Sequence, residues 1–137
     1  MLLGHPGGPL FARRDEGVWS IPKGLVESGE ELLAVAEREF EEETSRRVPD
    51  APRLDLGSIV QRGGKTVHAW AVEGDMDLRV AHSNTFEMEW PPRSGRLGTF
   101  PEIDRVAWFS AADARRSVNP GQIPLIERLE RALGDEP

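Results

Sequence analysis

The sequence predicts one domain of the α+β class, in which short strands are combined with amphipathic helices. The chain has 137 residues, which is the usual size of a single domain. Apolar residues recur at helical spacing over residues 28–44 and 120–133, and the shorter stretches between them are typical of strands. The sequence contains neither repeats nor a low-complexity linker, so residues 1–137 are expected to form one domain.

Composition narrows the classes of function. The net charge of −7 and the pI near 5.0 argue against non-specific binding of nucleic acid. The chain has no apolar run near the roughly 20 residues that cross a bilayer, and its first residues do not resemble a secretory signal. Cysteine is absent, which excludes disulfides and thiolate metal sites. We therefore expect a cytoplasmic protein without nucleic acid or membrane partners.

The elements before the main helix are expected to be short. Residues 1–3 are predicted to end a strand, residues 5–9 to form a turn, and residues 10–13 to form a brief strand. Residues 18–22 are expected to be extended, because Ile21 precedes Pro22 and is thereby disfavoured from helical geometry.

The strongest helix is predicted over residues 28–44. Ser28 and Glu31 match a capping box at its start. Its apolar arc is expected to contain Leu32, Leu33, Ala36 and Phe40.

The second half of the chain is predicted to alternate strands and helices. Strands are expected at residues 55–60 and 65–73, joined by a turn at Gly63 and Gly64. Residues 83–101, which are rich in proline and glycine, are predicted to be a long functional or mobile connection. A last strand at 106–109 precedes a short helix capped by Ser110. The helix at 120–133 is expected to bury Ile123, Ile126, Leu129 and Leu133.

The main helix has an unusual charge pattern, with eight glutamates and one arginine between residues 27 and 43. At about 100° per residue, Glu39, Glu42 and Glu43 share one flank, whereas Glu37 and Glu41 point toward solvent. Like charges at this spacing repel by roughly 0.2–0.5 kcal/mol per pair, and a divalent cation would reverse that sign. Carboxylate oxygens without cysteine or a nearby histidine select Mg²⁺ or Mn²⁺.

A solvated acidic face is the more common explanation of a glutamate-rich helix. Two features favour a metal site here. Glu43 lies at the edge of the apolar arc, where a purely solvated role is awkward. The helix also follows Pro22-Lys23-Gly24, which supplies a cation and a pliable backbone.

The same residues resemble the Nudix box: Gly24, five residues, Glu30, seven residues, Arg38-Glu39-Phe40, one residue, then Glu42-Glu43. The motif is long and fixed in spacing, so chance agreement is a poor explanation. The order of elements is similar to a Nudix domain over most of the chain, which implies an α/β/α sandwich around a mixed β-sheet. Residues 19–24 resemble the branch containing diadenosine polyphosphate and diphosphoinositol polyphosphate hydrolases.

The resemblance implies roles for the matching positions. Glu39, Glu42, Glu43 and the Gly24 carbonyl would bind the metal, and Arg38 would orient the glutamates. Glu30 would start the helix. The implied reaction is attack of a metal-activated water on a diphosphate linkage. The substrate would be a nucleoside diphosphate linked to another moiety: a dinucleoside polyphosphate, a nucleotide sugar or an NTP. The base would be Glu102 or one of the box glutamates.

Two departures from the family pattern are expected to have consequences. Ser45 and Arg46 stand where the box has glycine and an aliphatic residue, and serine in a left-handed C-cap should cost about 1 kcal/mol. The usual first strand is also missing before residues 1–3, so that either the start has been trimmed or another element fills the gap. We therefore expect an unpaired strand edge near residues 1–4, covered by a partner subunit in a homodimer.

Substrate contacts outside the box are predicted at Lys23, which could meet a phosphate, and at Trp90 and Arg93 in the long connection. Structural or solvated roles are the commoner explanation for His68 and for the remaining candidates, which are Trp19, Trp70 and Arg96. The alternative function is a Nudix-fold module that binds a nucleotide or regulates without turnover. The intact glutamates oppose this alternative, and the missing first strand favours it.

Overall fold

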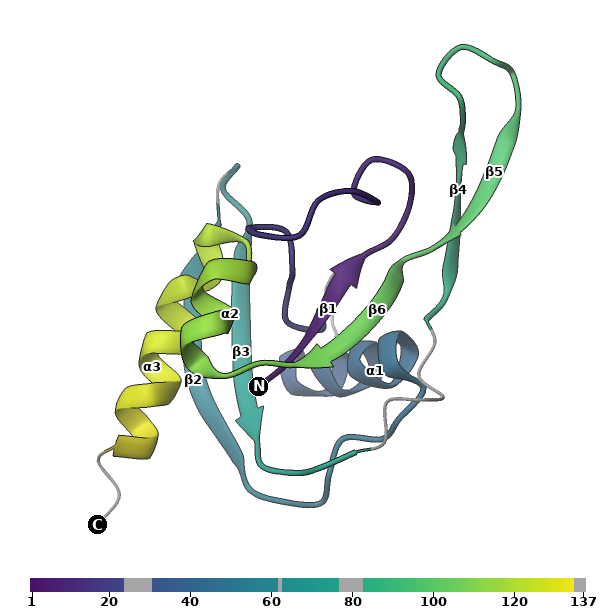
Figure 1. The fold of residues 1–137 in the computed structure, drawn as a ribbon. Coiled ribbons are helices and arrows are strands. Elements are labelled where there is room, and N and C mark those ends of the chain that lie inside the picture. The colour runs from purple at the N-terminus through teal and green to yellow at the C-terminus, as the bar shows by residue number, and fades with distance from the viewer. Residues whose placement is uncertain (24–30, 62, 77–82, 135–137) are drawn as a thin grey trace.

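A computed structural model describes residues 1–23, 31–61, 63–76 and 83–134 of the chain. In this part the fold is α+β, as predicted (Figure 1). The elements are β1 (Leu2–Pro6), α1 (Leu32–Thr44), β2 (Arg53–Val60), β3 (Thr66–Val72), β4 (Thr85–Glu89), β5 (Leu97–Pro101), β6 (Ile103–Trp108), α2 (Ala111–Ser117), the 3-10 turn η1 (Pro120–Gln122) and α3 (Ile123–Gly134). None of the described helices is long and apolar enough to span a membrane.

The strands pair as three two-stranded antiparallel sheets within the described residues: β1 with β6, β2 with β3, and β4 with β5. In Figure 1, α2 and α3 lie on one side of β2 and β3, and α1 lies on the other. One core cluster joins Leu3 and Trp19 to Ala114, Val118 and Ile126. A second packs Leu125 of α3 against Ile59, Val67 and Ala69 of the β2–β3 sheet.

The edge of β1 is paired at Gly4, so the prediction of an unpaired edge near residues 1–4 is wrong at that position. Leu3 faces Ala107 across the β1–β6 pair. On the opposite edge, the Gly4 N–H donates to the Ser20 carbonyl at 2.9 Å, and the Ser20 N–H donates back at 3.0 Å. The extended segment around Ser20 therefore covers β1 from within the same chain.

Residues 83–101 contain a β-hairpin, which corrects the predicted long connection. Exposure alternates along β4 and β5, and Phe86 faces Phe100 across the pair. This period of two is typical of a half-buried strand, and it outweighs prolines that fall at the turn or at a strand end. Residues 10–13 form turns instead of a strand, with the Arg14 N–H donating to the Phe11 carbonyl at 3.0 Å.

Helix α1 begins at Leu32, later than the predicted residue 28. Glu31 is the extended N-cap and makes no side-chain cap hydrogen bond, while Ser28 lies outside the described residues. Val35 is the apolar residue that α1 buries, whereas Leu32 is 44% exposed. The buried face of α1 is therefore rotated relative to the predicted apolar arc, because the spacing of apolar residues does not define the angle at which the helix packs on the strands.

The remaining helix ends follow the sequence more closely. Ser45 adopts the left-handed conformation expected of the C-cap, with φ 59° and ψ 24°. Ser110 caps α2 as predicted and accepts a hydrogen bond from the Asp113 N–H. On α3, Leu125 and Ile126 are the buried residues, and Leu133 is 58% exposed, which corrects its predicted burial at the frayed end of the helix.

Candidate active site

One flank of α1 presents the three glutamates that the sequence singled out. Arg38 lies against two of them: its Nη2 is 3.5 Å from Oε1 of Glu39, and its Nε is 3.9 Å from Oε1 of Glu42. The Glu39 side chain is only 16% exposed, whereas that of Glu42 is 41% exposed. The arginine therefore offsets negative charge at the outer part of this flank.

Glu43 is the most perturbed of the three. Its Oε2 accepts a hydrogen bond of 2.9 Å from the backbone N–H of Lys23. Burial raises the pKa of Glu43 to about 8, and the charges of Glu39 and Glu102 push in the same direction. The Lys23 N–H and ammonium oppose this rise without cancelling it. The half-buried carboxyl therefore sits where a nearby positive charge would favour ionisation.

Glu102 joins this group from a distant part of the sequence. It lies between β5 and β6, and its backbone N–H donates to the Asn84 carbonyl at 2.8 Å. Burial and the charge of Glu42 raise the pKa of Glu39 while Arg38 lowers it, and Glu102 adds a smaller raising effect. Glu102 thus lies within electrostatic range of Glu39 and Glu43, which the sequence could suggest only by resemblance.

Lys23 is held beside these carboxylates by its own segment. Burial lowers the pKa of its ammonium, Lys65 lowers it further, and Glu43 raises it. The segment that leads to Lys23 is fixed by Gln122, which is 1% exposed. Its Oε1 accepts from the Ile21 N–H at 3.0 Å, and its Nε2 donates to the Ser20 hydroxyl and to Gln61 Oε1, each at 3.0 Å.

Gln122 is a residue that the sequence analysis missed. A glutamine after Pro120 and Gly121 has no local pattern that marks it as buried. Its partners lie 101, 102 and 61 residues away, so only the folded chain reveals its role.

A divalent cation is the cofactor that the residues imply. Within residues 1–23, 31–61, 63–76 and 83–134, no three histidine, aspartate or glutamate side chains already surround a common point that could hold a metal ion. Gly24, the predicted backbone ligand, lies outside these residues. The chemistry of the donors nevertheless fits a hard cation, because burial and neighbouring negative charge raise the pKa of Glu39 and of Glu43, and a cation would offset this cost of ionisation.

The aromatic and arginine side chains that were considered as substrate contacts do not lie beside the glutamates in this structure. Trp90 and Arg93 belong to residues 90–96, which join β4 to β5 at a tip far from α1 (Figure 1). Trp19 is a core residue with 4% exposure, and its Nε1 donates to Asp15 at 2.8 Å. His68 stacks on Trp70 with ring centroids 4.3 Å apart and contacts Asp55 at 2.7 Å.

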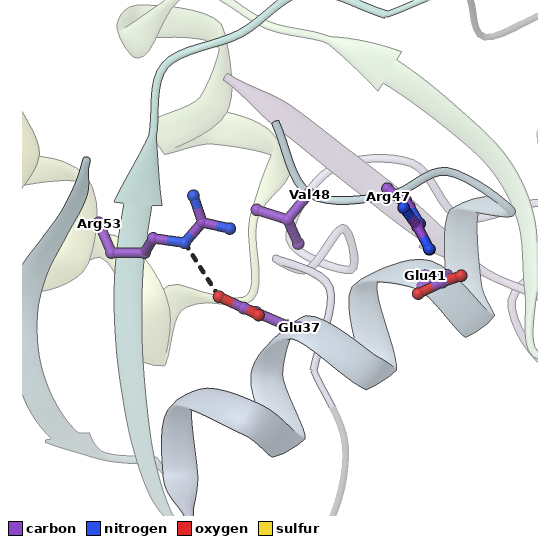
Figure 2. A pocket seen from close by; sticks show the side chains of 5 residues that line it. All are labelled: Glu37, Glu41, Arg47, Val48 and Arg53. Carbon is purple, nitrogen blue, oxygen red and sulfur yellow. Dashed lines mark hydrogen bonds and ion pairs between the residues drawn. The ribbon is translucent and has the colours of Figure 1, made fainter. Parts of the chain in front are cut away.

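The opposite flank of α1 borders a shallow pocket of about 200 Å³, lined by Glu37, Glu41, Arg47, Val48 and Arg53 (Figure 2). Glu37, expected to face solvent, instead accepts a hydrogen bond of 2.9 Å from Arg53 Nε. Arg53 also donates to the carbonyls of Pro49 and Ala51. These contacts attach the connection between α1 and β2 to the helix, so the pocket has a structural explanation.

Comparison with known proteins identifies the family to which the chain belongs. The chain is 33% identical over 108 residues to an octanoyltransferase of Myxococcus xanthus, covering 77% of this chain and 27% of that protein. It is 42% identical over 43 residues to the putative nudix hydrolase 6 of Caenorhabditis elegans, covering 31% of this chain and 16% of that protein. The chain thus spans a minor part of both relatives. No solved structure matches it. The family model described as the NUDIX domain matches residues 4–129, and the chain therefore belongs to the Nudix family.

Proposed function

We propose that the chain hydrolyses a diphosphate linkage with the help of Mg²⁺, for which Mn²⁺ can substitute. The observation that carries the proposal is the gathering of Glu39, Glu43 and Glu102 from two distant segments, with Glu43 half-buried and its pKa raised. Burial and the negative charge of neighbouring carboxylates disfavour ionisation of Glu39 and Glu43, and a cation that joined these groups would offset that cost. Family membership supports the same chemistry.

The box glutamates Glu39, Glu42 and Glu43 would hold the ion together with the Gly24 carbonyl. When bound, a divalent cation supplies positive charge that polarises a water molecule and the departing phosphate. Arg38 orients Glu39 and Glu42 through its two ion pairs. Lys23, whose ammonium lies beside Glu43, would bind a phosphate oxygen as a point charge. Glu102 or one of the box glutamates would accept the proton from the attacking water.

The substrate class in this proposal is a nucleoside diphosphate linked to another moiety, as in a dinucleoside polyphosphate, a nucleotide sugar or an NTP. Resemblance of residues 19–24 to the diadenosine and diphosphoinositol polyphosphate branch supports the first of these. The octanoyl transfer named for the bacterial relative stays with that protein, because only 27% of its length is matched.

The proposal includes the setting of the activity. The proposed architecture is a single α/β/α sandwich over residues 1–137 around a mixed sheet. Helices on both sides of β2 and β3 support the layers, while the pairs formed by the named strands of the described residues are antiparallel. The absence of cysteine and the charge of −7 support a cytoplasmic protein that needs neither nucleic acid nor a membrane. Trp90 and Arg93 would reach a substrate at the glutamates only if the β4–β5 hairpin moved. A homodimer is the assembly in which a contact of these two residues with a substrate would be tested.

The direct test is incubation with dinucleoside polyphosphates, nucleotide sugars and (deoxy)NTPs, with Mg²⁺ or with EDTA. We expect Mg²⁺-dependent release of phosphorylated products, and its loss by at least about 100-fold in Glu43→Gln. The matched control is Glu41→Gln, which changes an exposed glutamate two residues away on the same helix. Binding of a nucleotide without turnover of any substrate would favour the alternative, a non-catalytic or regulatory module.

A further inference from the structure

A second cavity lies between the turn that follows β1 and the β4–β5 hairpin. Its volume is about 210 Å³, and it is lined by Gly7, Gly8, Leu10, Phe11, Phe86 and Met88. All six described lining residues are glycine or apolar. A cavity of this kind recognises its occupant by shape and by contact with apolar surface.

The wall formed by the turn is fixed by hydrogen bonds. The Phe11 N–H donates to the Gly8 carbonyl, and the Arg14 N–H donates to the Phe11 carbonyl. His5, which is fully buried, anchors this turn to β6: its Nε2 is 2.6 Å from the Arg14 carbonyl and its Nδ1 is 2.8 Å from Asp104 Oδ1. The turn side of the cavity is therefore held in place by contacts within the fold.

The two glycines keep the cavity open and close to the hairpin. A Cβ on Gly8 would lie 2.9 Å from the Phe86 ring, and the φ of +95° at Gly8 also disfavours a side chain. A Cβ on Gly7 would lie 1.8 Å from the Pro101 carbonyl oxygen. Any larger residue at these positions would displace the hairpin wall.

The wall of the cavity is bonded to the backbone of Glu102, a residue of the candidate active site. The Gly7 N–H donates to the Glu102 carbonyl at 2.9 Å, so the cavity wall and Glu102 are direct neighbours. The charge of Glu102 acts on both Glu39 and Glu43. On the turn side, the Arg14 guanidinium lies 5.6 Å above the Phe11 ring, which places an exposed cation beside the cavity.

We propose that this cavity binds the apolar group carried by the diphosphate substrate, either the face of a nucleobase or a short hydrocarbon chain. The inference rests on the proposed function, since the diphosphate would lie toward Glu102 and the box glutamates. A site for a whole drug-sized ligand occupies roughly 300–1,000 Å³, so a cavity of about 210 Å³ holds one such group and leaves the phosphates outside. Phe11 and Phe86 supply the aromatic surface.

The test compares three diphosphates that differ in this group: ADP, dimethylallyl diphosphate and methyl diphosphate. Dissociation constants are measured by calorimetry on the full chain with Mg²⁺. We expect ADP or dimethylallyl diphosphate to bind at least about tenfold more tightly than methyl diphosphate. Leu10→Trp should remove that preference by filling the cavity and leave methyl diphosphate binding unchanged. The control is Leu97→Trp, since Leu97 is 72% exposed on β5 and does not line the cavity.

A second variant separates the two ligand classes and replaces Leu10→Trp if that protein does not fold. Phe86→Leu keeps an apolar wall but removes a ring, so it should weaken ADP selectively if the natural group is a nucleobase. Equal binding of all three diphosphates, or a preference that survives both Leu10→Trp and Phe86→Leu, would overturn the inference.

Hydrolysis is followed separately, with the dinucleoside polyphosphates, nucleotide sugars and (deoxy)NTPs of the direct test. A preference that depends on Leu10, without turnover, contradicts the proposed hydrolase but supports the cavity. Turnover without the preference contradicts the cavity alone.

Discussion

The backbone N–H of Lys23 donates a 2.9 Å hydrogen bond to the carboxylate of Glu43, joining two positions 20 residues apart. This bond favours the charged form of Glu43, but burial has the larger effect and leaves its pKa at about 8. Without a cation, burial therefore favours the protonated form of Glu43. The site is built for a positive charge that the polypeptide itself only partly supplies.

The metal-free protein should lose stability as the pH rises through this range. The folded-state pKa of Glu43 is about 8, against an ordinary value of 4.5, so folding binds a proton between these values and unfolding releases it. In EDTA, urea denaturation between pH 5 and pH 8 should therefore give a falling free energy of unfolding. Glu43→Gln should have a flatter dependence, whereas Glu41→Gln should follow the wild type. Parallel curves for wild type and Glu43→Gln would contradict the raised pKa.

Mg²⁺ binding should become tighter as the pH rises. A cation displaces the proton that Glu43 holds. The apparent affinity of the protein for Mg²⁺ should therefore increase by up to about tenfold for each pH unit as the pH rises toward 8. Calorimetry in buffers of different ionisation enthalpy measures the proton released. In Glu43→Gln the affinity should be lower and nearly independent of pH. An equally steep pH dependence in that variant would show that another group is titrating.

Gln122→Leu should destabilise the fold and the entrance to the candidate site. The change removes the acceptor for the Ile21 N–H and the donor to Ser20 and Gln61, at an expected cost of about 2–3 kcal/mol. Gln61→Ala removes one of these bonds and should cost about 1 kcal/mol. Urea denaturation of the two variants tests this difference, and equal losses would argue against a central role for Gln122. Diphosphate hydrolysis at a temperature where both are folded tests whether the Ile21 segment positions Lys23.

Ser45→Gly should stabilise the protein. Ser45 has φ 59° at the end of α1, a conformation that glycine adopts without the steric cost a Cβ incurs. We expect a gain of about 0.5–1 kcal/mol in the free energy of unfolding, with hydrolysis unchanged. Ser45→Ala is the matched control, since it retains the Cβ. If alanine stabilised as much as glycine, the serine hydroxyl and not the backbone would be responsible.

Local patterns in the sequence predicted most of the elements. The cap at Ser110, the left-handed Ser45 and the β2–β3 hairpin follow from interactions within a few residues, which a sequence displays directly. The β4–β5 hairpin was missed because its prolines and glycines hid the alternation of Phe86 and Met88 with glutamates. The buried face of α1 was misjudged because the direction in which a helix packs depends on distant strands.

The candidate site was predictable to a similar extent. Helical periodicity brought Glu39, Glu42 and Glu43 together, because these residues are neighbours on one element. Burial and neighbouring charge at Glu43 depend on Lys23 and Glu102, which approach from other segments. Gln122 gave no signal, since its partners lie 61 to 102 residues away. His5 gave none either, since its partner on β6, Asp104, lies 99 residues away. The family resemblance suggested Glu102 as a base, but only the fold shows that it lies within electrostatic range of Glu39 and Glu43.

The pairing of β1 with β6 constrains the order in which this chain can fold. The contact of His5 with Asp104 closes a separation of 99 residues, for which chain entropy alone costs about 4 kcal/mol. The β2–β3 hairpin closes over a few residues and should form early, whereas β1 lacks its longer pairing, with β6, until residues 103–108 are in place. The ribosome must therefore release the chain beyond residue 108 before β6 can anchor the turn at residues 7–11. In native-state hydrogen exchange, the amides of this late-assembled region would be among the first to open.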